Sequence, residues 1–418
     1  MRRYERYKDS GVEWLGEVPS HWELKRLKQL FVEKKHKQSL SLNCGAISFG
    51  KVIEKSDDKV TEATKRSYQE VLKGEFLINP LNLNYDLISL RIALSEIDVV
   101  VSAGYIVLKE KQIINKKYFS YLLHRYDVAY MKLLGSGVRQ TINYGHISDS
   151  ILVIPPLSEQ QKIAQFLDDK TAKIDQAVDL VEKQIALLKE HKQILIQNAV
   201  TRGLNPDVPL KDSGVEWIGQ VPEHWDVQRS KFIFKKIERK VNEEDQIVTC
   251  FRDGQVTLRA NRRTEGFTNA LKEHGYQGIR KGDLVIHAMD AFAGAIGISD
   301  SDGKATPVYS VCLPHDKQKI DVYFYAYYLR NLALSGFISS LAKGIRERST
   351  DFRYSDFAEL LLPIPPYLEQ QKIADYLDKQ TSKIDRAIAL KTAHIEKLKE
   401  YKNVLINDVV TGKVRVSV

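Results

Sequence analysis

Two short segments of the sequence place an arginine close to a glycine, in a setting suited to reading nucleic-acid bases. They are GVRQ at residues 137–140 and GIRE at residues 344–347. An arginine can donate two parallel hydrogen bonds to a guanine edge, and a glutamine can pair with an adenine edge. A neighbouring glycine also lets the backbone approach a ligand closely. Arg139, Gln140, Arg346 and Arg348 are therefore candidate DNA-binding residues, although a solvated surface is the simpler interpretation for each of them taken singly.

Other basic residues cluster in the same two regions of the chain. Lysine and arginine bind phosphate groups more often than bases, although a solvated surface is the simpler interpretation for any one of them. The 63 lysines and arginines against 54 aspartates and glutamates give a formal charge of +9, which favours an anionic partner such as double-stranded DNA. The candidate DNA-binding residues in these clusters are Lys34, Lys35, Lys235, Lys236, Arg262 and Arg263.

The sequence has no motif that would let the chain cut or methylate DNA by itself. Asn79-Pro80-Leu81-Asn82 lacks the second proline and the aromatic residue of an amino-methyltransferase loop, and no glycine-rich motif for a methyl donor accompanies it. Two E-x-K triplets, at 190–192 and 400–402, lie on expected helices without the further carboxylates of a metal-dependent nuclease. There is no GxxxxGK[ST] loop for ATP. We therefore expect no catalytic residue, no cofactor and no metal ion in this chain.

Cysteine usage and hydropathy favour an intracellular protein. Cys44, Cys250 and Cys312 are far apart and form no CxxC pair, which argues against a disulfide scaffold or a zinc site and favours a reducing cytoplasm. The first residues lack the apolar core of a signal peptide, and no run of about 18 apolar residues is long enough to span a membrane. We expect a cytoplasmic protein that does not contact a membrane.

The chain contains one unit twice in tandem. Residues 8–28 and 211–231 are 203 positions apart and identical at 14 of their 21 positions, while residues 154–177 and 364–387 match at an offset of 210. Between these segments lies a divergent body of about 120 residues in each copy. A constant frame around variable content suits a protein that reads two different targets in one geometry. Plain gene duplication with drift is the alternative, but it would not by itself preserve the ends and change the middle.

The C-terminal part of each copy is expected to form a long helix. Ser158 and Gln161 fit a capping box after Pro155-Pro156. Apolar residues then recur at steps of three and four, the pattern of a helix that packs on other helices. Lys192 and Lys402 fall in this seam, where they either fix the register or extend to solvent at its edge. The candidate seam and subunit-interface residues are Ile174, Val178, Val181, Ile185, Leu188, Leu195, Ile384, Ile388, Ile395, Leu398 and Leu405.

Further apolar residues widen the apolar face beyond what a pair of helices covers. They are Leu180, Leu187, Ile194, Leu390 and Val404. We expect partner helices from another protein to complete a bundle of about four, unless the globular bodies cover the excess. About 27 residues make a helix of about 40 Å, and one turn of B-DNA measures about 34 Å. An antiparallel pair, with the bodies at opposite ends about a pseudo-two-fold axis, would therefore serve as a ruler between two half-sites.

The divergent bodies combine short strand-like runs with helices, which predicts an α+β fold. Lys-Gly-Glu at 73–75 and Lys-Gly-Asp at 281–283 are interpreted as hairpin turns. Segments 117–134 and 322–342 are expected to be amphipathic helices, and the four tryptophans to fasten each N-terminal segment onto its body or helix. The domains expected are a first body at 1–155, a helix at 156–202, a second body at 203–365 and a helix at 366–418.

These strings resemble the specificity subunits of type I restriction-modification enzymes. The resemblance rests on DSGVEWLGEVPSHW and DSGVEWIGQVPEHW near the start of the two copies, and on IPPLSEQQKIAQFL and IPPYLEQQKIADYL at their exits. It covers both copies and the lengths between these motifs, and therefore effectively the whole chain. Leu368 in place of Ser158 is a small departure.

The resemblance implies a non-catalytic DNA-binding subunit of a prokaryotic enzyme. Each divergent body would be a target recognition domain that reads one half of a split site in the major groove. The conserved helices would form an antiparallel pair that sets the gap and docks two modification subunits, and restriction subunits would join to cleave DNA with ATP. The alternatives are a single-chain methyltransferase-endonuclease, for which no methyl-donor motif is found, and a stand-alone DNA-binding regulator.

Overall fold

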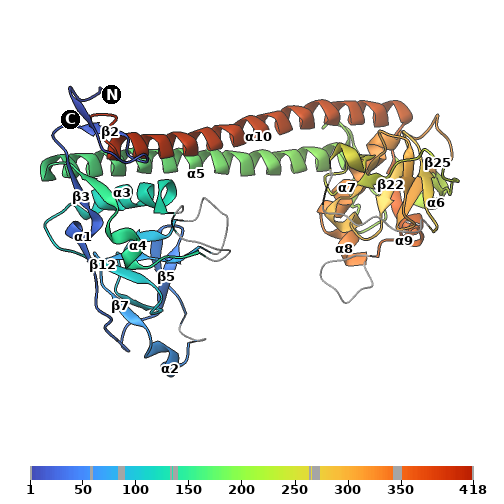
Figure 1. The fold of residues 1–418 in the computed structure, drawn as a ribbon. Coiled ribbons are helices and arrows are strands. Elements are labelled where there is room, and N and C mark those ends of the chain that lie inside the picture. The colour runs from blue at the N-terminus through green and yellow to red at the C-terminus, as the bar shows by residue number, and fades with distance from the viewer. Residues whose placement is uncertain are drawn as a thin grey trace. The chain divides into compact units, whose positions relative to one another are not determined.

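The computed structural model describes residues 2–56, 60–82, 90–131, 134, 140–262, 265, 274–341 and 351–416. The chain divides into two compact units, Met1–Val181 with Ala393–Val418, and Glu182–Thr392. We call them unit 1 and unit 2. Each unit contains one divergent body and a part of both long helices (Figure 1).

Unit 1 is built around a four-stranded antiparallel sheet with the strand order β10-β8-β12-β4. Helix α3 packs on β10 at one edge of this sheet, and the buried faces of both enter one apolar core with Trp22 and the ends of the long helices. The strands are β1 Tyr7–Asp9, β2 Glu17–Pro19, β3 Glu23–Arg26, β4 Phe31–Glu33, β5 Gly45–Ser48, β6 Lys51–Glu54, β7 Gln69–Val71, β8 Phe76–Ile78, β9 Leu81–Asn82, β10 Ile92–Leu94, β11 Val99–Val101, β12 Ile106–Glu110, β13 Gln140–Thr141 and β14 Ile151–Ile154. The short helices are α1 Leu27–Leu30, α2 Glu62–Lys65, α3 Lys116–Ala129 and α4 Tyr144–Ser148.

Unit 2 repeats this plan with the sheet order β18-β25-β22-β23 and helix α7 packed on β23. Its strands are β15 Leu210–Asp212, β16 Gln220–Pro222, β17 Asp226–Arg229, β18 Phe234–Lys236, β19 Val248–Cys250, β20 Val256–Leu258, β21 Gln277–Ile279, β22 Leu284–His287, β23 Ile296–Ile298, β24 Gly303–Ala305, β25 Tyr309–Pro314 and β26 Leu361–Ile364. Its short helices are α6 Ser230–Ile233, the 3-10 helices Arg259–Asn261 and Ala291–Ala293, α7 Val322–Leu334, α8 Phe337–Leu341 and α9 Tyr354–Glu359. The predicted α+β bodies are thus confirmed.

The Lys-Gly-acid turns are tight turns, but the prediction that they close hairpins is wrong. Gly74 and Gly282 both have φ of +89°, which a glycine adopts without strain. Strand β7 before the first turn pairs with β11, whereas β8 after it pairs with β10 and β12. The turn therefore carries the chain from one sheet to another, and local sequence contains no information about that pairing.

The hydrogen bonds of α3 and α7 fix the alignment of the two copies. Asn115 and Asp321 each cap the N-terminus of their helix, and each backbone N–H donates to the side chain of a glutamine, Gln160 or Gln370, in the long helix of its unit. The offset is therefore 206 in these helices. Tyr118-Phe119 then corresponds to Phe324-Tyr325. The identical letters Tyr-Phe would instead align it with Tyr323-Phe324, one position earlier.

The long helices are α5, Leu157–Arg202, and α10, Tyr367–Val410, of 46 and 44 residues. They are longer than the 27 or so residues of the heptad region alone, because the segment after each Pro-Pro continues directly into it. Backbone N–H groups of Glu159 and Gln160 donate to the carbonyl of Pro156, so Ser158 lies inside the first turn and the predicted capping box is wrong. None of the described helices is long and apolar enough to cross a membrane.

Within each unit the two long helices run antiparallel. In unit 1, Lys402 of α10 pairs with Asp175 of α5, and in unit 2, Lys192 of α5 pairs with Asp385 of α10, both at 2.7 Å. Both lysines and both aspartates are repeat equivalents at an offset of 210. Two bodies with paired long helices are the architecture that the sequence predicts.

Candidate nucleic-acid interface

Four of the candidate DNA-binding residues lie outside the described residues. These are Arg139, Arg263, Arg346 and Arg348. The backbone of Gln140 lies in β13, where it pairs with Asn82 of β9, and its side chain is not described. The assignment of these residues to DNA contact therefore remains a prediction.

The structure places Lys34 in an internal ion pair. Its ammonium lies 2.8 Å from Glu75 and 3.1 Å from Glu70, and the side chain is 14% exposed. Burial alone would raise the pKa of Glu70, but the hydrogen bonds from Lys34 and Lys37 lower it below its ordinary value. At the corresponding place in unit 2, Arg239 pairs with Asp283 through both terminal nitrogens. These pairs stabilise each body internally. Because the charge of Lys34 is already balanced by Glu70 and Glu75, it is poorly placed to bind a phosphate.

The other described lysine candidates lie on the surface. Both Lys35, two residues after edge strand β4, and Lys235, in the middle of edge strand β18, are exposed. Lys236 shares its charge with Glu238 at 2.9 Å. Because an exposed ion pair is weak and easily exchanged, Lys236 stays available to a phosphate.

Arg262 lies beside the two-stranded ribbon formed by β19 and β20. Its guanidinium is 2.7 Å from Asp253 and lies over the ring of Phe251, 4.3 Å from the centroid. Arg252, at the tip of the same ribbon, is exposed and pairs with Asp290 at 2.8 Å. Arg252 is not among the predicted residues, because only the pairing of β19 with β20 places it at a tip.

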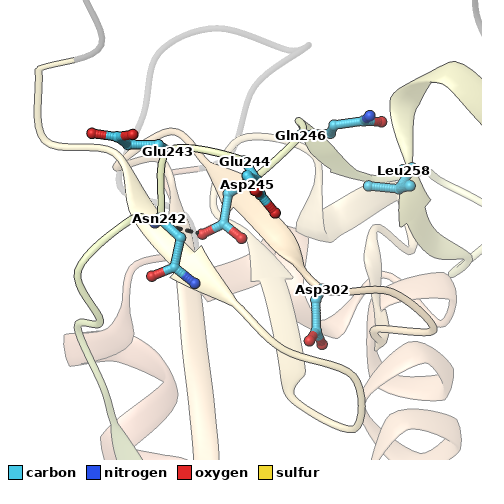
Figure 2. Close-up of a pocket in the computed structure, with 7 residues that line it drawn as sticks. All are labelled: Asn242, Glu243, Glu244, Asp245, Gln246, Leu258 and Asp302. Carbon is cyan, nitrogen blue, oxygen red and sulfur yellow. Dashed lines mark hydrogen bonds between the residues drawn. The ribbon is translucent and has the colours of Figure 1, made fainter.

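Another face of unit 2 is unsuited to DNA. A cavity of about 350 Å³ is lined by Asn242, Glu243, Glu244, Asp245, Gln246, Leu258 and Asp302 (Figure 2). Asp245 is held by the backbone of Asn242 and by Arg280, and the other three carboxylates add negative charge that repels phosphate. The described residues contain no group of three histidine, cysteine, aspartate or glutamate side chains able to hold a metal ion.

The N-terminal segment of each copy is fastened to the start of a long helix by one glutamate. In unit 1, Glu159 of α5 accepts hydrogen bonds from Tyr4 and Trp22 at 3.0 Å and lies 2.7 Å from His21. In unit 2, Glu369 of α10 lies 2.7 Å from His224. Burial raises the pKa of Glu159, but the hydrogen bonds of its partners outweigh this and lower it.

The predicted roles of the tryptophans agree with these contacts. Trp22 and Trp225 are fully buried in their units, and Trp14 and Trp217 pack on aromatic rings of the bodies.

The candidate interface residues on the helices divide into covered and uncovered positions. Ile174, Val181, Ile395 and Leu405 are buried in the chain itself. The remaining seam candidates, Val178, Ile185, Leu188, Leu195, Ile384, Ile388 and Leu398, are half-buried. The flanking residues Leu180, Leu187 and Ile194 of α5 and Leu390 and Val404 of α10 are exposed, with Leu187 at 63%. The apolar surface that stays free is thus the flanking set, while the seam residues pack largely within the chain.

Comparisons with known proteins agree with this architecture. The profile of the family described as "Type I restriction modification DNA specificity domain" matches residues 19–189 and 222–400. A putative type I restriction enzyme MjaX specificity subunit of Methanocaldococcus jannaschii is 24% identical, over 96% of both chains. The MjaVIII specificity subunit of the same organism is 28% identical over 63% of this chain and 62% of its own.

Two solved structures share the fold. One comes from a study of complex assembly and conformational transition of the type I R-M system, with a TM-score of 0.67, 16% identity, and coverage of 95% of this chain and 99% of the other. The other is the HsdS subunit from Thermoanaerobacter tengcongensis, with a TM-score of 0.54, 16% identity, and coverage of 97% and 100%. The two family matches fall on the two copies of the repeat and together span most of the chain, and the protein therefore belongs to the type I restriction-modification DNA specificity family.

Proposed function

We propose that this chain is the specificity subunit of a type I restriction-modification enzyme, and that each body reads one half of a bipartite DNA site. The observation that carries the proposal is the contrast within the repeat. Even single ion pairs of the frame are duplicated, Lys192–Asp385 and Lys402–Asp175. In contrast, the turn between β5 and β6 in unit 1 and the turn between β19 and β20 in unit 2 carry different residues. A reader of two unlike half-sites needs this combination of constant geometry and variable contacts.

The division of labour that we propose follows the repeat. Residues 1–155 and 203–365 form the two target recognition domains, and residues 156–202 and 366–418 form the helices that set the gap between half-sites. The chain itself has no catalytic role. The modification subunits methylate adenine, and restriction subunits, where the system has them, cleave DNA with ATP.

A genome-wide map of methylated adenine tests this function. Cells with the intact system and cells without this chain are compared. We expect a two-part motif whose methylation disappears with the chain, and the distance between its two parts gives the gap. A methylation pattern that is the same in both cells would refute the proposal.

The exposed apolar residues of the long helices are the proposed docking surface for modification subunits. Leu180 and Leu390 are repeat equivalents, as are Ile194 and Val404, so the surface occurs twice and fits two copies of one partner. Side chains of this kind do not stabilise the free chain where they face water, and an apolar patch of this sort marks a site of protein association. A regulator that binds DNA without partner subunits would not need such an exposed apolar surface.

Docking is tested on exposed positions, because a change at half-buried Ile185 or Leu188 would also disturb the helix pair. We expect the double variant Leu180→Glu with Ile194→Glu to abolish co-purification of a modification subunit. Its free energy of unfolding should stay within about 0.5 kcal/mol of the parent value. The matched control is Lys189→Glu, an exposed charged position on the same helix. Retention of the subunit by the double variant would place the docking surface elsewhere.

A further inference from the structure

Phe49 has an exposure that folding alone does not explain. It lies between β5 and β6, and its side chain is 91% exposed. It is also the only non-glycine residue with a positive φ, +46°, among the residues that the structure describes. A bulky L-residue in this region is strained, and such strain concentrates at functional positions.

The turn itself calls for another residue. Ser48 pairs with Lys51, so Phe49 and Gly50 form a two-residue hairpin loop in which both have positive φ. Asn-Gly and Asp-Gly are the preferred sequences for such a loop, because asparagine and aspartate tolerate the left-handed conformation. A phenylalanine here gains no burial and bears the strain, so its advantage must come from something outside the chain.

The ribbon holds Phe49 on a rigid base. Ile47 and Val52, one from each strand, pack on a small apolar cluster of the body. A side chain at Gly50 would come within 2.8 Å of Leu90, so the tip is seated against the body at that point. His124 of α3 lies beside it and is fixed by a 2.8 Å contact to the carbonyl of Ile92.

Unit 2 carries the same base with a different tip. Its ribbon β19–β20 is seated through Gly254 on Arg330 of α7, the position equivalent to His124 at the offset of 206. The exposed side chains around this tip include Arg252 and Arg262. The two ribbons thus contact their bodies at equivalent positions but carry different exposed side chains, as expected for two domains that read different half-sites.

We propose that the β5–β6 ribbon enters the major groove of DNA and that the Phe49 ring contacts the 5-methyl group of a thymine in the half-site read by unit 1. The inference rests on the proposed function. The major groove admits a two-stranded ribbon, and the thymine methyl is the apolar feature that an aromatic side chain can recognise there. Lys51, next to the tip, is exposed and free to approach a phosphate.

The test uses the full chain with its modification subunits and a duplex that carries the mapped bipartite site. The half read by unit 1 is identified by exchanging residues 30–150 with those of another family member. Each thymine of that half is then replaced in turn by deoxyuridine, which removes only the methyl group. We expect one replacement to weaken binding about three- to fivefold, the equivalent of one buried methyl. The Phe49→Ala variant should bind the thymine and uracil duplexes equally well.

A second variant separates reading from folding. Phe49→Asn relieves the turn, so it should leave the melting temperature unchanged or raise it while weakening binding to the site about tenfold, as for a lost base contact. Ile113→Ala is the matched control, because Ile113 is an apolar residue of the same unit that is 86% exposed and lies outside the ribbon. It should leave binding unchanged.

Several results would overturn the inference. They are a unit 1 half-site with no A·T pair, equal binding of the parent to every uracil duplex, or undiminished binding by Phe49→Asn. Each of these leaves the specificity function intact if the parent still binds its mapped site. Absence of any mapped site would instead refute the proposed function.

Discussion

A buried ion pair in unit 1 offers a sharp test of the packing. Asp127 of α3 is fully buried, and it accepts hydrogen bonds from the backbone N–H of Arg91 at 2.5 Å and from its Nε at 3.1 Å. The other two guanidinium nitrogens of Arg91 are buried without a hydrogen-bond partner among the described residues. Arg91 therefore depends on Asp127 for its compensating charge.

Unit 2 has apolar residues at the positions that the ion pair occupies in unit 1. At the equivalent places it has Ala295, directly before β23, and Ala333 in α7. Both are buried, and α7 packs on β23 as α3 packs on β10. The fold therefore does not require the pair. Removing one partner of a buried pair costs about 3–5 kcal/mol, whereas replacing both by apolar residues of similar volume is often neutral or stabilising by about 1–4 kcal/mol.

We expect Asp127→Ala to destabilise unit 1 by about 3–5 kcal/mol, and Arg91→Met with Asp127→Leu to be at least as stable as the parent. Urea unfolding gives the free energies, and hydrogen exchange of the amides in α3 and β10 assigns the loss to unit 1, with α7 and β23 as the internal reference. A loss below about 1 kcal/mol in Asp127→Ala, or an equal loss in the double variant, would refute this account.

Two further predictions concern the frame. The single variant Lys402→Asp places two aspartates together at the seam and should destabilise the chain. Adding Asp175→Lys should restore about 0.5–1 kcal/mol, as for an exposed ion pair, in a double-mutant cycle measured by urea unfolding. A coupling energy of zero would mean that the pair does not fix the register. The lowered pKa of Glu159 predicts that its contribution is complete above the ordinary pKa of 4.5 and is lost as the pH falls through the lower folded-state pKa. Melting curves of Glu159→Gln should therefore show a shallower loss of stability in acid than the parent, and parallel profiles would contradict the assigned role.

The fold class could be predicted from the sequence because its signals are local. Heptad spacing is a property of residues three and four positions apart, so the long helices are visible without knowledge of their partners. The tandem repeat is likewise a comparison of the sequence with itself. Together these predicted two bodies of one architecture and two long helices, whereas the DNA-reading family was indicated by the resemblance of the repeated motifs to known specificity subunits.

The tertiary structure decided which residues face water, a partner or the chain itself. Lys192 and Lys402 find Asp385 and Asp175, partners 193 and 227 positions away in the sequence, which no window around either lysine contains. Lys34 belongs to a basic cluster in the sequence, yet the pairing of β4 with β12 and of β12 with β8 turns it toward Glu75. Phe49 is an ordinary apolar residue in the sequence, and only the register of β5 with β6 places it at an exposed tip. Periodicity fixes the type of an element, whereas the surroundings of a side chain depend on contacts between distant segments, which form only when the whole chain has folded.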